Sequence, residues 1–230
     1  MILYAIPTPL GGAPQEVLPS AVLDTVRTLK DFAVENAKSA RAFLSQVNMP
    51  LALREVRIHE IGEQPESLLQ PLREGRALGL LSEAGCPAIA DPGARLIEAA
   101  HREGFRVVPL VGPSSITLAL MASGLEGQRF AFCGYLPRDP GERARRIREL
   151  EVRSKKEKET EIFIETPYRS DALLAALLEA CHAQTRLCVA ADLTLPTESI
   201  STRGVAEWRK GKITIGRRPA VFLLLAHPRG

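Results

Sequence analysis

The chain alternates short apolar runs with longer amphipathic stretches along nearly its whole length, and this alternation constrains the fold most. Parallel strands need helical crossovers between them, so such alternation is typical of an α/β protein. The apolar runs are residues 3–6, 32–35, 56–59, 77–82, 107–110, 130–134, 162–165, 187–191 and 220–226. The stretches with helical spacing are residues 21–30, 38–47, 66–74, 94–103, 115–123, 142–155 and 171–182.

The alternation loosens near the middle of the chain. Gly112-Pro113-Ser114 follows the fifth apolar run, and a Gly-bearing stop covers residues 123–127. Further on, residues 197–202 alternate like a strand with no helix before them. We therefore predict two α/β domains, residues 1–112 and 113–230, the second with a mixed sheet.

Composition permits several partners. Hydrophobic residues make up 45% of the chain and aromatic residues 5%, which suits buried parallel strands rich in Leu, Val, Ile and Ala. The net charge of +3 allows a nucleic-acid substrate without requiring one. No apolar run approaches the ~18 residues that span a bilayer, and the N-terminus lacks a signal-peptide pattern, so we expect a cytoplasmic protein that binds no membrane.

The sequence lacks the motifs of several common metal-binding, nucleotide-binding and hydrolytic sites. The four cysteines form no C-x-x-C pair, so we expect buried thiols in a reducing compartment and no metal. The sequence has no G-x-G-x-x-G after its first strand, no P-loop, no G-x-S-x-G elbow and no H-E-x-x-H. Common dinucleotide, nucleoside-triphosphate and His-based hydrolytic enzymes are thereby disfavoured.

Four loops that follow predicted strands are rich in Gly, Pro and small polar residues. Ligands of open α/β sheets collect at these strand ends. The first loop, residues 7–12, has two prolines and two glycines, which suit either a ligand contact or a tight connection. The second, residues 81–93, is about twice the usual length of ~2–6 residues and offers the carboxylate of Glu83 to a ligand. Within it, Asp91-Pro92 is typical of a helix start, with Asp91 as the N-cap.

The third and fourth loops carry hydroxyl and basic groups. Capping of a helix would explain one of Ser114 and Ser115, so with Thr117 a surplus of hydroxyl groups is left for a ligand. In the fourth loop, Tyr168 and Arg169 either contact a planar, anionic substrate or lie on the surface at a helix start.

Five segments taken together resemble a known family. Y-A-I-P-T-P-L-G at residues 4–11 is similar to an opening V-P-T-P-I-G, and residues 82–93 are similar to S-D-A-G-T-P…S-D-P-G. Residues 108–115 resemble V-P-L-P-G-P-S-A, residues 132–138 resemble F-x-G-F-L-P-R, and residues 165–169 resemble E-S-P-H-R. In this order they resemble the ribosomal RNA small-subunit methyltransferase I group of the tetrapyrrole-methylase superfamily.

The resemblance implies a dimeric methyltransferase with S-adenosylmethionine in the cleft between two α/β domains. Carried over by position, the residues implied to bind the cofactor are Pro9, Glu83, Gly85, Cys86, Ile89, Ser114, Ser115, Thr117, Tyr135, Thr166, Ala191, Leu193 and Ala220.

The chain departs from the family on the substrate side. Where the ribosomal enzymes carry E-D-T-R-H-T, residues 35–40 keep Glu35 and lose most of the rest. Their H-E-H-N-E survives only in part at residues 59–63, and their extra C-terminal segment has no counterpart. Methyl transfer is therefore the stronger inference, and ribosomal RNA as the acceptor is the weaker one.

Three functions stay open at this point. An RNA methyltransferase acting on a ribose hydroxyl would need a general base, for which Glu35 and Glu83 are the candidates. In the basic stretch 138–158, Arg145 and Arg146 either contact RNA or belong to a solvated helix with internal ion pairs. The alternatives are a methyltransferase of a small tetrapyrrole or corrinoid precursor, and a non-catalytic protein that binds S-adenosylmethionine or RNA.

Overall fold

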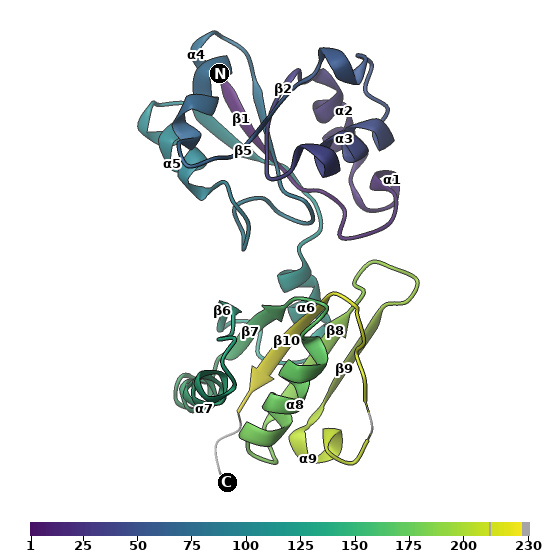
Figure 1. Ribbon diagram of the computed structural model, residues 1–230, viewed down its shortest axis with the longest axis vertical. Coiled ribbons are helices and arrows are strands. Elements are labelled where there is room, and N and C mark those ends of the chain that lie inside the picture. Colours follow the sequence, from purple (N-terminus) through teal and green to yellow (C-terminus); the bar gives the residue numbers. More distant parts are fainter. Residues whose placement is uncertain (212, 227–230) are drawn as a thin grey trace. The chain divides into compact units, whose positions relative to one another are not determined.

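The computed structural model describes residues 1–211 and 213–226 and consists of two compact units (Figure 1). The first unit is Met1–Ser114, and the second begins at Ser115. Each unit contains one five-stranded sheet with helices packed on it, so the predicted α/β class is confirmed. None of the helices in the described ranges is long and apolar enough to cross a membrane.

The first sheet is entirely parallel, with the order β3-β2-β4-β1-β5. Its interior strands are apolar on both faces because helices cover both, as the continuous apolar runs predicted. The strands are β1 (Ile2–Ile6), β2 (Asp31–Val34), β3 (Arg57–Glu60), β4 (Leu78–Leu81) and β5 (Arg106–Pro109).

Helices cover both faces of this sheet (Figure 1). On one face, α2 (Ser20–Thr28) and α3 (Ala37–Gln46) pack around the buried Phe32. On the other, α4 (Gln70–Arg73) and α5 (Ala94–Arg102) pack against the alternate side chains of the same strands. The remaining short elements are α1 (Pro14–Val17), η1 (Leu53–Glu55) and η2 (Pro65–Leu69).

One predicted helix has a different form. Residues 66–74 were expected to be a single helix, but the chain makes the 3-10 helix η2 and then the short α4. Pro71 has no N–H to donate and its ring clashes with the preceding turn, so a continuous α-helix cannot run through it. The four-residue helices α1 and α9 (Val205–Trp208) were not predicted because they are too short to show helical periodicity.

The second sheet is mixed, as predicted, with the order β6-β7-β10-β8-β9. Only β6 and β7 are parallel neighbours, and the other adjacent pairs are antiparallel. The strands are β6 (Phe130–Tyr135), β7 (Thr160–Glu165), β8 (Arg186–Ala191), β9 (Ser199–Gly204) and β10 (Ala220–Leu225).

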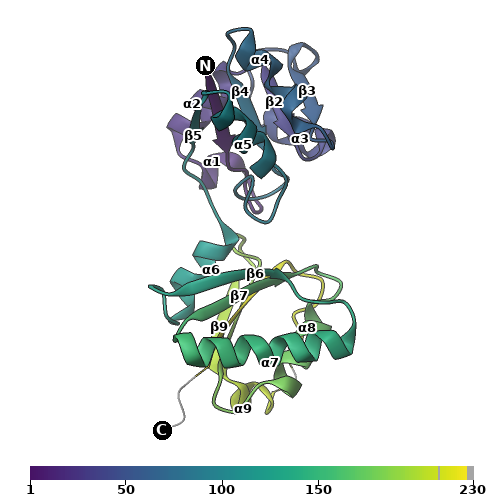
Figure 2. The same ribbon diagram turned by 90° about the vertical axis from the view of Figure 1, so that its left-hand side faces the viewer.

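Two helices, α7 (Pro140–Glu157) and α8 (Ser170–Ala180), cover one face of the second sheet (Figure 2). The core below them includes the stacked rings of Phe163 and Phe222, whose centroids are 6.0 Å apart, and Trp208. Helix α6 (Ser115–Ser123) packs against β8, β9 and β10.

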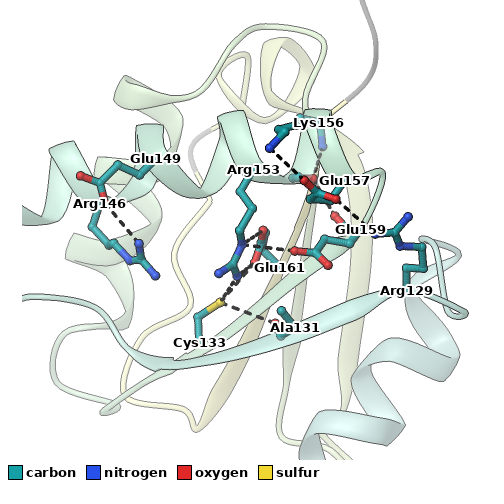
Figure 3. Close-up of polar contacts among 12 residues, drawn as sticks. Arg129, Ala131, Cys133, Arg146, Glu149, Arg153, Lys156, Glu157, Glu159 and Glu161 are labelled. Atoms are coloured by element: carbon teal, nitrogen blue, oxygen red, sulfur yellow. Dashed lines mark hydrogen bonds and ion pairs between the residues drawn. The ribbon is translucent and has the colours of Figure 1, made fainter.

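A buried ionic cluster ties the inner side of α7 to β6 and β7 (Figure 3). The carboxylate of Glu161 is fully buried and accepts hydrogen bonds from Arg153 Nε, at 2.7 Å, and from Arg153 Nη2. The Cys133 thiol donates to Glu161 Oε2 at 3.2 Å. Burial, and then the hydrogen bond to Glu161, raise the pKa of Cys133 to about 11, so this thiol stays protonated at neutral pH.

Candidate functional site

The first three predicted loops meet at the carboxyl edge of the first sheet. Thr8 N donates to Gly85 O at 2.9 Å, and Gly85 N returns a bond to Thr8 O at 3.0 Å. The Ser82 hydroxyl donates to Gly85 O at 3.2 Å, and the Cys86 thiol contacts Pro113 O at 3.5 Å. The structure thus brings together the loops that carry the predicted cofactor residues Pro9, Glu83, Gly85, Cys86, Ile89 and Ser114.

The second of these loops has a strained backbone. Gly85 and Gly93 have φ of 80° and 131°, and the non-glycine residues Ala88 and Ala90 also have positive φ, 65° and 66°. A left-handed conformation costs an alanine about 1–2 kcal/mol. Strain of this kind persists where surrounding structure imposes it, and it clusters at ligand-binding sites. Ile89, between the two alanines, has 49% of its surface exposed.

Three carboxylates gather beside this loop. Glu35 follows β2, the neighbour of β4, and its Oε2 accepts a hydrogen bond from the backbone N of Glu83 at 2.9 Å. Asp91 lies close enough to both carboxylates for their charges to act on it, and the Ser82 side chain lies near it as well. Burial, together with the negative charges of Glu35 and Glu83, raises the pKa of Asp91 to about 6, although the nearby Ser82 side chain opposes the shift.

The predicted N-cap role of Asp91 is wrong. Helix α5 begins at Ala94, and its N-cap is Gly93, whose φ of 131° favours glycine. Asp91 therefore turns back toward the start of its own loop, where it joins Glu35 and Glu83. Sequence reasoning missed this carboxylate because Asp-Pro also has a local explanation as a helix start.

We expect Asp91→Asn to stabilise the fold near neutral pH. The folded-state pKa is raised from 3.8 to about 6, so the stability from protonated Asp91 is full below the unfolded value and is lost as the pH rises through about 6. Asparagine stays neutral, so the variant should gain about 1 kcal/mol, or about 2–4 °C in melting temperature, at about pH 7.5 and nothing at about pH 4, after allowance for solvent screening. Calorimetric melting at the two pH values checks this. Asp24→Asn, at an exposed position on α2, is the control, and an equal gain at both pH values contradicts the prediction.

A second group of predicted residues lies at the carboxyl ends of β6, β7 and β8. Strand β10 runs antiparallel between β7 and β8, and its first residue, Ala220, lies opposite both Glu165 and Ala191. Tyr135 pairs with Ile164 on the neighbouring strand. This register brings the predicted residues Tyr135, Thr166, Ala191, Leu193 and Ala220 to one edge of the second sheet.

Unpaired polar atoms gather at this same edge. The Glu165 side chain is fully buried, and its Oε1 accepts from Thr166 N and from Arg169 Nη2, each at 2.6 Å. Within residues 1–211 and 213–226, the side-chain atoms that are buried without a hydrogen-bond partner are Arg143 Nε, Glu165 Oε2, Arg169 Nη1 and Thr194 Oγ1. Each of these residues follows β6, β7 or β8 or ends one of them. Buried polar groups are normally satisfied, so this concentration indicates a place where a ligand supplies the partners.

The predicted substrate residues occupy two different places. Tyr168 is 79% exposed beside this edge, and the guanidinium of Arg217 lies 5.4 Å from the centre of its ring. Arg145 and Arg146 lie on α7, and both are paired with Glu149, at 3.7 and 3.2 Å (Figure 3 shows the second pair). Ser115 and Thr117 begin α6, in the second unit; Ser114 and Thr117 each already have polar or electrostatic partners.

A cavity of about 260 Å³ lies elsewhere, at the amino-terminal ends of β2, β3 and β4. Arg57 and Arg76 line it and both bond the buried Asp31. None of the predicted site residues lines this cavity. In the described part of the chain, no group of three or more potential ligands is placed to hold a metal ion.

Comparison with known proteins gives consistent matches. The family model of the tetrapyrrole (corrin/porphyrin) methylases matches residues 17–207. The ribosomal RNA small subunit methyltransferase I of Mesorhizobium japonicum is 32% identical over 227 residues, which cover 95% of this chain and 75% of that protein. The protein of the same name from Vibrio cholerae is also 32% identical, with 90% and 69% covered.

Solved structures show the same fold. The methyltransferase CobJ superimposes with a TM-score of 0.61 at 19% identity, covering 100% of this chain and 96% of that one. The uroporphyrin-III-C-methyltransferase from Thermus thermophilus gives a TM-score of 0.54 at 21% identity, covering 97% and 94%.

Proposed function

From the premise that the chain belongs to the tetrapyrrole methylase family, and is thus an S-adenosylmethionine-dependent methyltransferase, we propose that its methyl acceptor is RNA. The observation that carries this proposal is the 32% identity to ribosomal RNA methyltransferases over nearly the whole chain. The similar tetrapyrrole-modifying structures are 18–21% identical and support the fold alone. A ribose 2'-hydroxyl of ribosomal RNA is the acceptor we infer.

The carboxyl edge of the first sheet fits the methionine end of the cofactor. When bound, S-adenosylmethionine supplies an electrophilic methyl group on a positively charged sulfur. The carboxylates of Glu35, Glu83 and Asp91 provide the negative charge that favours such a cation. The left-handed backbone at Ala88 and Ala90 leaves Ile89, between them, 49% exposed, so this part of the loop is accessible to a ligand.

The edge of the second sheet fits an adenosine. Glu165 Oε2 is a buried acceptor without a partner, which suits an amino or hydroxyl group, and Thr194 Oγ1 can donate or accept. Ala191 and Ala220 are small, so a flat base can approach the strand ends closely. The placement of the cofactor between the two domains stays a prediction.

The acidic group also supplies candidates for the general base. Glu35 already accepts the backbone N–H of Glu83, so it holds the loop in position. A hydroxyl acceptor must lose its proton as its oxygen takes up the methyl group, and a carboxylate with a raised pKa serves this step well near neutral pH. Glu83 and Glu35 stay our candidates, and Asp91 joins them on its position.

Tyr168 and Arg169 are the residues we propose for substrate binding at the second edge. Arg145 and Arg146 both pair with Glu149. Because this carboxylate already occupies them, we propose that they attract the RNA at long range and do not bind it directly. A homodimer and a cytoplasmic location stay predictions.

Two measurements on the purified protein test the function. Calorimetry should detect binding of S-adenosylmethionine, and radiolabelled methyl groups should then appear in total cellular RNA, where nuclease mapping identifies the acceptor. Label found in a porphyrinoid pool and not in RNA would reject the RNA acceptor. Binding of the cofactor with no transfer to either pool would identify a non-catalytic homologue.

A further inference from the structure

We propose that the exposed surface at the carboxyl edge of the second sheet, outside the buried Glu165 that we assign to the adenosine, holds an unpaired nucleotide of the acceptor RNA, whose base stacks on Tyr168 and whose phosphate pairs with Arg143 and Arg217. This inference rests on the proposed RNA acceptor and adds the surface and the single-stranded state that is recognised. Two of its three residues, Arg143 and Arg217, had no assigned role.

Three adjacent strands bring these residues to the same edge. Arg143 lies in the first turn of α7, after β6, and Tyr168 follows β7. Arg217 precedes β10, the antiparallel neighbour of β7, whose Ala220 lies opposite Glu165. Because β6, β7 and β10 are consecutive in the sheet, segments that are distant in the sequence lie along the same edge of it.

Neighbouring hydrogen bonds hold Arg217 in position against the ring of Tyr168. Asp171, in the first turn of α8, accepts hydrogen bonds from Ile215 N at 2.6 Å and Gly216 N at 3.3 Å, so it anchors the segment that carries Arg217. Arg218 is anchored in turn by Asp192 at 3.6 Å. The guanidinium of Arg217 therefore lies against the Tyr168 ring, 5.4 Å from its centre, while the tyrosine stays 79% exposed.

The positive charges at this edge are free to pair with a ligand. Of the residues that the structure describes, no carboxylate lies within ion-pair distance, 4.0 Å, of Arg138, Arg143 or Arg217. Arg143 Nη1 contacts Arg138 O at 3.4 Å, and its Nε is buried without a partner, as is Arg169 Nη1. Arg145 and Arg146, two and three residues further along α7, have Glu149 as a counter-ion.

This combination suits single-stranded RNA. Bases that are out of a duplex stack on tyrosine rings and on arginine guanidinium planes, and arginines pair with the phosphates beside them. A base inside an A-form duplex offers no open face to Tyr168, so duplex RNA would gain only the ionic contacts.

The binding of a short fluorescent RNA, single-stranded or annealed to its complement, tests the proposal by anisotropy. For the single strand, Tyr168→Ala should weaken binding about 10-fold and Tyr168→Phe should keep it. Arg143→Gln and Arg217→Gln should each lower the salt dependence of log K by about 0.7. None of the three residues belongs to a buried ion pair, so folding should be preserved. Arg129→Gln, an exposed arginine paired with Glu157 before β6, is the matched control and should bind RNA like the parent.

The outcomes separate this inference from the proposed function. If the parent protein binds S-adenosylmethionine but no RNA, both the proposed RNA acceptor and the nucleotide site at Tyr168 are wrong. If Tyr168→Ala and Arg217→Gln bind RNA as tightly as the parent protein does, only the nucleotide site is overturned. Loss confined to Arg145→Gln and Arg146→Gln would place the RNA beside Glu149 on α7 and not at the sheet edge. An equal loss for the duplex in Tyr168→Ala would contradict recognition of an unpaired nucleotide.

Discussion

Replacing Gly112 by alanine should lower the affinity for S-adenosylmethionine by about 10- to 100-fold, because it forces apart two of the loops that we propose bind the cofactor. A Cβ at this position would lie 2.4 Å from Pro7 Cβ and 3.0 Å from Leu18 Cδ2. The proline ring is fixed to its backbone and cannot rotate away. The loop after β5 must therefore move away from the loop after β1, and the Cys86–Pro113 contact at 3.5 Å would move with it.

Calorimetric titration with the cofactor measures this effect, and Gly62→Ala provides the matched control. Gly62 lies in the same unit, and an added Cβ there meets nothing within 4 Å, so its affinity should equal that of the parent. Trp208 is the single tryptophan of the chain and is buried in the second unit, so its fluorescence shows whether that unit stays folded. Normal affinity in Gly112→Ala would mean that these loops do not contact the cofactor.

Replacing Arg153 by methionine should destabilise the second unit by about 3 kcal/mol. The substitution keeps much of the side-chain volume but leaves the fully buried Glu161 without its cation (Figure 3). Cys133 alone would then bond to that carboxylate. Arg153 is 39% exposed, so solvent screens part of the interaction, and we place the cost at the low end of the range for broken buried pairs.

Urea denaturation followed by Trp208 fluorescence checks this expectation, since Trp208 and α7 share one core. The same substitution at Arg145, on the exposed side of α7, should cost about 0.5 kcal/mol or less. The double variant Arg153→Met/Glu161→Leu should recover most of the loss, because it removes the buried charge as well as its partner. If the double variant is no more stable than Arg153→Met, packing rather than the unpaired carboxylate explains the cost.

The short-range pattern of the sequence predicted most of the secondary structure, but not the break in the helix expected over residues 66–74 or the four-residue helices α1 and α9. Continuous apolar runs predicted the buried strands, and stretches with helical spacing predicted α2, α3, α5, α6, α7 and α8, because burial of one face is recorded in the residues of each element itself. The motifs at the strand ends were also sufficient to identify the family, because five of them occur in a fixed order along the chain.

Sheet order and register were not readable from the residues, because they depend on partners far apart in the chain. The insertion of β10 between β7 and β8 brings Ala220 beside Glu165, and it brings Arg217 to Tyr168. The return of the second loop brings Asp91 to Glu35 and raises its pKa, whereas the local Asp-Pro pattern indicated a helix cap. Periodicity is a property of neighbours along the chain, whereas burial, charge pairing and unsatisfied hydrogen-bonding groups arise only when distant segments pack together.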